Sequence, residues 1–289
     1  MRIVAIFVAF VLFTAFQPIP PRVERLREAL MRDPDCSVQR FGYDRELGLV
    51  RCGNWDGGPK SGAVLLNAGL IAGVALDYWN EQAGEPTHIE ANVRKRLEEF
   101  DYDGEDKREV LLGRLPSCVR GSSGQQHYDA TGVIVTALPT ECMRKPTPDR
   151  LVAMPQLVPW IVFLYRQGHV DEAQALYDAA SDEWLPEDGM GIDGSTGGVF
   201  SDALDRGRCK SARVLGYYLL AGRLTGFDKY DPEIAQEVEN QLWALQNPDG
   251  SIRVAYALDR RCNRGRSTPE STGLSLLAMT PPEVLLNPR

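Results

Sequence analysis

Several signatures of familiar chemistries are missing from this chain of 289 residues. No two of its cysteines have the C-x-x-C spacing, which argues against structural zinc sites and thioredoxin-like redox chemistry. Lysine is scarce, with six residues, and the formal net charge is −8, which argues against a general nucleic-acid surface. The sequence gives no signature of a cofactor or of a metal site.

The N-terminal segment has the features of an export signal. Arg2 provides a positive start, and the uncharged, apolar residues 3–16 suit a signal-peptide core but fall short of the roughly 20 residues of a membrane-spanning helix. A small-x-small cleavage site is missing. We therefore expect residues 1–21 to be a signal peptide or a retained membrane anchor, with a buried core helix as the alternative. Residues 22–289 are expected to form a single secreted or cell-surface domain.

Six cysteines follow this segment, and an even number is typical of disulfides in exported proteins. The order of the predicted helices favours three pairs, of which the first two would each staple one loop and the third would join two equivalent loops. These pairs are Cys36–Cys52, Cys118–Cys142 and Cys209–Cys262.

Hydrophobic periodicity predicts two kinds of helix that alternate along the chain. Amphipathic helices are expected at residues 22–32, 87–100, 170–180 and 231–245, and helices that are apolar nearly all round at 63–79, 155–165, 212–224 and 269–279. Thr87 and Glu90 have the spacing of a capping box, and Asp231 is expected to cap its helix. A β-branched run at 132–138 predicts a short strand.

Two of the long loops share the tetrapeptide Ala-Leu-Asp-Arg, at residues 203–206 and 257–260, and a cysteine follows each copy. This match indicates an internal repeat, whose equivalent loops would lie close together. Amphipathic outer helices around apolar inner ones predict a mainly α protein. The expected fold is an α/α toroid, or an open arc, of about four helical hairpins with long disulfide-stapled loops and little β structure.

Residues 245–252 (LQNPDGSI) are similar to the L-Q-x-x-D-G-S/G-W turn of the prenyltransferase and squalene-cyclase repeats, with Ile252 in place of the aromatic. In such a turn Gln246 would hydrogen-bond backbone at the helix end, and Asp249 and Gly250 would make a tight reversal. Residues 269–278 resemble the inner helix that follows, and residues 183–189 are a degenerate copy of the turn. The resemblance covers about the last third of the chain and implies the α/α-toroid fold.

The activities of that superfamily do not follow from the fold. The D-x-D-D motif of the cyclases, the Asp/Cys/His zinc set of the prenyltransferases and the thioester motif G-C-G-E-Q of complement-type toroids are all absent.

The loops that enter the inner helices carry the candidate site, because toroids hold their sites at the rim of the central cavity. Two of these loops are basic within an acidic protein. Their candidate ligand-binding residues are Arg206, Arg208, Arg260 and Arg264, with Trp184 as a possible sugar contact and Asp205, Asp259 and Glu270 as candidate acids or bases. The alternative is a structural network of ion pairs that holds the loops.

A glycine-rich loop between the second pair of cysteines carries His127 and Tyr128, which could supply a general base. Toroidal polysaccharide lyases use Tyr or His in this way, with Arg at the substrate carboxylate; an ordinary polar loop is the alternative. Two functions are therefore expected. One is a lyase or hydrolase acting on acidic polysaccharide, and the other is a non-catalytic module that binds an anionic glycan or a protein partner at the cell surface.

Overall fold

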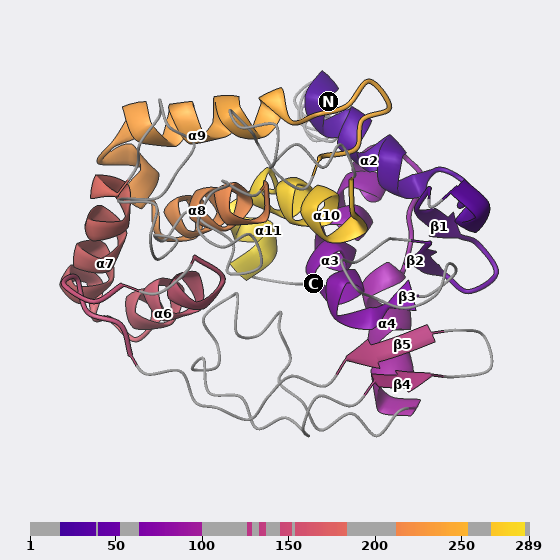
Figure 1. The fold of residues 1–289 in the computed structure, drawn as a ribbon, viewed down its shortest axis with the longest axis horizontal. Helices are drawn as coiled ribbons and strands as arrows, with labels where there is room; N and C mark the ends of the chain where they lie inside the picture. The colour runs from indigo at the N-terminus through magenta and orange to yellow at the C-terminus, as the bar shows by residue number, and fades with distance from the viewer. Residues whose placement is uncertain are drawn as a thin grey trace, which may run out of the picture.

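The computed structural model describes residues 18–38, 40–52, 64–99, 126–128, 133–136, 145–151, 154–183, 212–253 and 267–286. This part of the chain is mainly helical, as predicted (Figure 1). The predicted leader lies outside it as far as residue 17. None of the helices in these ranges is both long and apolar enough to cross a membrane.

Each predicted helix is present within a few residues of its expected bounds. The amphipathic helices are α2 (Pro21–Met31), α4 (Ile89–Glu99), α7 (Val170–Asp182) and α9 (Pro232–Ala244). The apolar helices are α3 (Leu66–Gln82), α6 (Met154–Arg166), α8 (Ala212–Thr225) and α10 (Pro269–Ala278), and the short α11 (Pro282–Leu286) follows them. Asp231 caps α9 as predicted, accepting a hydrogen bond from the Ile234 N–H at 3.3 Å.

The four apolar helices form one row in the order α6, α8, α10, α3 (Figure 1). One amphipathic helix packs on each of them: α7 on α6, α9 on α8, α2 on α10 and α4 on α3. The buried side chains of the row belong to a single apolar cluster. This arrangement explains the two kinds of periodicity, since only the inner helices are covered on several sides. It also brings the first described helix, α2, against the late helix α10.

Neighbouring inner helices α3 and α10 run in the same direction. Early in both helices, Gly273 lies so close to Ala72 that a Cβ at Gly273 would be 2.5 Å from the Ala72 Cβ. Further along both helices, the Trp79 Nε1–H donates to the Thr280 hydroxyl at 3.1 Å. Contacts that advance together along two helices require parallel axes.

Short turns with a left-handed glycine join three inner helices to the outer helices that pack on them. Gly84, Gly168 and Gly226 follow α3, α6 and α8, and their φ angles are +76°, +83° and +76°. The Gly84 and Gly168 N–H groups close the helix ends by donating to carbonyls three residues back, at 3.0 and 3.1 Å. Glycine is favoured here because a Cβ disfavours this backbone conformation.

The turn that follows α9 holds α2 in place. The Gln246 side-chain amide donates to the backbone carbonyls of Gly250, at 3.2 Å, and of Arg22, at 3.0 Å, which confirms the predicted contact between the glutamine and backbone. Gly250 has φ +87°, and a Cβ there would overlap the Arg25 carbonyl. Asp249 extends the contact through an ion pair with Arg32 at 2.6 Å.

The N-terminus of α4 is capped differently from the prediction. The Thr87–Glu90 capping box is wrong, because Asp77 of α3 accepts the N–H groups of Ile89, at 2.8 Å, and Glu90, at 3.0 Å. Thr87 instead donates its hydroxyl to Asp77 at 2.7 Å. A carboxylate satisfies two free N–H groups and also interacts favourably with the helix dipole, so it displaces the weaker local cap.

The described part of the chain also contains five short strands: β1 (Gly42–Asp44), β2 (Leu49–Arg51), β3 (Val64–Leu65), β4 (Gln126–Tyr128) and β5 (Val133–Thr136). The strand predicted at 132–138 is confirmed by β5. Strands β1 and β2 pair as an antiparallel hairpin, and the Arg51–Asp44 ion pair of 2.7 Å links them.

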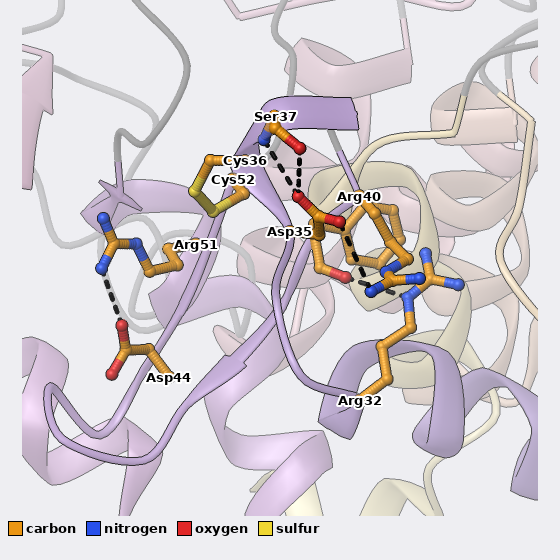
Figure 2. Close-up of a disulfide and its surroundings, with 9 residues drawn as sticks. Arg32, Asp35, Cys36, Ser37, Arg40, Asp44, Arg51 and Cys52 are labelled. Atoms are coloured by element: carbon orange, nitrogen blue, oxygen red, sulfur yellow. Dashed lines mark hydrogen bonds and ion pairs between the residues drawn. A yellow bond between two sulfur atoms is a disulfide. The ribbon is translucent and has the colours of Figure 1, made fainter.

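A disulfide joins Cys36, in the short helix before β1, to Cys52, directly after β2 (Figure 2). Their Cα atoms are 4.8 Å apart, and the bridge confirms the first predicted pair. Beside it, Asp35 accepts hydrogen bonds from the backbone and hydroxyl of Ser37. The hairpin is therefore tied at its base to the segment that follows α2. The pairs Cys118–Cys142 and Cys209–Cys262 lie outside the described residues.

Candidate functional site

The starts of α8 and α10 lie side by side. Arg213, the second residue of α8, has its Nε 3.6 Å from Oε1 of Glu270, the second residue of α10. The Arg213 guanidinium also lies 5.9 Å from the ring centroid of Tyr217. The Glu270 side chain is 15% exposed. Glu270 is the one predicted acid or base whose side chain falls within the described residues.

The first turn of α10 fixes the position of Glu270. Thr268 caps the helix by accepting the Ser271 N–H at 3.1 Å, and Pro269 occupies the first helical position. The Thr272 hydroxyl accepts the Ile252 N–H at 3.1 Å. This bond ties the start of α10 to the end of the turn that follows α9.

The inner helices α3, α8 and α10 are parallel, so their N-terminal ends lie on the same side of the row. We call this side the entry end. Helix α8 is parallel to α10, because Arg213 meets Glu270 at their starts and Arg223 donates to the Ala278 carbonyl at their ends. The entry end therefore collects the positive ends of three helix dipoles. It is also the end at which the two arginine-rich segments join the helices, at Ala212 and Pro269.

The strand that carries His127 and Tyr128 also lies at the entry end. These residues pair with Val135 and Ile134 of β5, and β5 in turn pairs with β3. Strand β3 continues directly into α3, so the small sheet adjoins the start of that helix. The backbone topology therefore brings this strand to the entry end, where Glu270 also lies.

The other predicted site residues lie outside the described part of the chain. They are Asp205, Asp259, Arg206, Arg208, Arg260, Arg264 and Trp184. Within the described ranges, no group of three His, Cys, Asp or Glu side chains is placed to hold a metal ion.

A feature that the sequence did not reveal is a groove of about 690 Å³ over the C-terminal end of α10, between α2 and α9. Trp243 of α9 lines it and is only partly buried, although its place in a helix predicts a core residue. The Arg22 guanidinium lies 5.6 Å from the centroid of the Trp243 ring. No local pattern marks this groove, because its walls come from both ends of the sequence: Pro20, Pro21, Pro281 and Pro282.

Comparisons of the chain with protein-family models, with curated proteins and with solved structures found no match. The function of the protein is therefore argued from its own residues and contacts.

Proposed function

We propose that the entry end of the inner row binds an acidic polysaccharide outside the cell, and that the row is an arc of an α/α toroid with four helical hairpins. The observation that carries the proposal is the Arg213–Glu270 contact, which brings the starts of α8 and α10 together. The order α6, α8, α10, α3, with an amphipathic helix on each, supports the toroid. The resemblance of residues 245–252 and 269–278 to toroid repeats also supports it.

The sequence supports this proposal, because two of the candidate arginines precede the helix starts by only a few residues. Arg208 is four residues before Ala212 and Arg264 is five before Pro269. An extended chain spans at most about 3.6 Å per residue, so their Cα atoms lie within about 14 and 18 Å of the helix starts. Arginines near the positive ends of parallel helices favour a polyanion, and their planar forks suit carboxylates.

In the catalytic form of the proposal, the protein is a lyase. His127 or Tyr128 would remove the proton from the carbon beside the uronate carboxylate, while Arg206 and Arg260 hold that carboxylate. The bond from the neighbouring carbon to the glycosidic oxygen then breaks as a carbon–carbon double bond forms. Asp205, Asp259 or Glu270 would protonate the departing oxygen. A hydrolase would use the same carboxyl groups to activate water and protonate the leaving group.

The alternative is a non-catalytic module that binds an anionic glycan or a protein partner at the cell surface. The Arg213–Glu270 contact favours it, because the one candidate acid or base whose side chain is described already has a cationic neighbour within the protein. In this form the arginines only bind the partner, and the N-terminal segment would be the sole link to the membrane.

The test titrates the oxidised full-length chain with acidic and neutral polysaccharides and measures binding together with release of unsaturated products. The variant Arg206→Ala/Arg260→Ala is compared with Arg45→Ala/Arg150→Ala, which removes the same charge at two exposed positions elsewhere. Cleavage lost only in the first variant supports the lyase. Salt-sensitive binding without cleavage, also lost only there, supports the module. Absence of binding, or equal loss in both variants, contradicts the proposal.

A further inference from the structure

The groove over the C-terminal end of α10 has a polar wall with fixed geometry. Glu239 accepts the Trp243 Nε1–H at 2.9 Å with one carboxylate oxygen and the Arg223 Nη2–H at 2.7 Å with the other. Arg223 is itself held by the Ala278 carbonyl. Each carboxylate oxygen can accept a further hydrogen bond, and the Glu239 side chain is 26% exposed. The wall can therefore accept a hydrogen bond from a ligand hydroxyl without rearranging.

Arg22 lines the same groove and contacts no carboxylate of the described residues. Its backbone carbonyl accepts the Gln246 amide, and its guanidinium lies over the Trp243 ring. Among the described residues no ion pair involves Arg22, whereas nearby Arg223 pairs with Glu239. A cation–π contact with an indole uses no N–H donor of the guanidinium, so these donors can still bind a ligand carboxylate. The groove thus offers an exposed cation beside an aromatic ring.

We propose that this groove binds a hexuronic acid residue of an acidic glycan. The uronate carboxylate would receive a bidentate pair from Arg22, the apolar face of the sugar ring would lie against Trp243 and the flanking prolines, and a hydroxyl would donate to Glu239. The volume of about 690 Å³ accommodates a short oligosaccharide.

This second site is distinct from the entry end, because the groove and Glu270 lie at opposite ends of α10. Only the choice of a uronate over other carboxylates rests on the proposed function.

The test is calorimetric titration of the full-length chain with a hexuronic acid trisaccharide, a neutral trisaccharide and an acidic tripeptide. We expect the uronate to bind and the other two to bind at least tenfold more weakly. Arg22→Ala should weaken uronate binding about tenfold or more, because it removes charge-assisted hydrogen bonds. The matched control is Arg25→Ala, an exposed arginine on the same helix that does not line the groove, with an expected change below about twofold.

A second variant, Trp243→Phe, keeps a ring but loses the bond to Glu239, and we expect it to weaken binding less than Arg22→Ala. Equal binding of the neutral sugar, tighter binding of the peptide, or equal losses in Arg22→Ala and Arg25→Ala overturns the groove proposal.

Failure of the entry-end site can be told apart from failure of the groove site. If Arg206→Ala/Arg260→Ala leaves trisaccharide binding intact while Arg22→Ala abolishes it, the groove site stands and the entry-end site fails. The reverse pattern overturns the groove site alone.

Discussion

The two ends of α10 are built differently. At its start, Glu270 meets Arg213, and the turn after α9 is bonded to both α2 and α10. At its end, Arg223 pairs with Glu239, yet the neighbouring Arg22 contacts the Trp243 ring, has no ion pair among the described residues and lines an open groove.

The difference separates two uses of arginine in one small region. An arginine in an ion pair joins two secondary-structure elements, so its substitution should lower the free energy of unfolding. An arginine that pairs with no carboxylate contributes little to folding, so its substitution should instead lower the affinity for a ligand. Substitutions around α10 can test whether this division holds.

The largest effect is expected at Gly250. Gly250→Ala places a Cβ against the Arg25 carbonyl at φ +87°, so the turn must separate from α2. We expect a loss of about 2–4 kcal/mol in the free energy of unfolding. Gly84→Ala is the matched control, since Gly84 has φ +76° but nothing within 4 Å of the added Cβ; it should cost about 1–2 kcal/mol from the backbone alone. Similar losses in both variants would show that the turn does not clamp α2.

The second-largest loss of stability is expected at Arg223, at the C-terminal end of α10. Arg223→Ala leaves the Ala278 carbonyl and the Glu239 carboxylate without their charged donor, and we expect a loss of about 1–3 kcal/mol. Chemical denaturation measures this loss. The control is Lys229→Ala, at an exposed position on the following turn, which should change the free energy of unfolding by less than about 0.5 kcal/mol. A loss no greater than that of the control would remove Arg223 from the set of structural arginines.

Sequence reasoning succeeded where the determinants are local. Helix positions follow from apolar periodicity, and the caps at Asp231 and Thr268 follow from adjacent residues. It failed where the partner is distant, as at α4, whose cap comes from Asp77 on another helix. The groove was missed for the same reason, because Arg22 of α2 and Trp243 of α9 are far apart in the sequence and meet only in the folded chain. Of the candidate site, the described residues show Glu270 beside Arg213 of α8, and the strand with His127 and Tyr128 near the start of α3.

Acid should weaken the contact between α2 and the turn after α9. Burial raises the pKa of Asp249, but hydrogen bonds from Ser251 and Arg32 outweigh it, so the pKa lies below its ordinary value. A lowered folded-state pKa contributes stability above the unfolded value of about 3.9, and that contribution is lost as pH falls through the folded pKa. The stability difference between wild type and Asp249→Asn should therefore be constant near neutrality and shrink below about pH 4. If the stability difference between wild type and Asp249→Asn stays the same below about pH 4, the Asp249 carboxylate does not stabilise this contact. Asp171→Asn, at an exposed position, serves as the control.

The smallest effect is expected at Glu270, where the chain supplies a close control. Glu270 of α10 and Glu233 of α9 both follow a proline at the first helical position, so each interacts with its own helix dipole in the same way. Among the described residues, Glu270 contacts an arginine and Glu233 contacts none. Glu270→Gln should therefore cost about 0.2–1 kcal/mol more than Glu233→Gln at low salt, and this difference should shrink at high salt. Equal costs would mean that the 3.6 Å contact contributes nothing to folding.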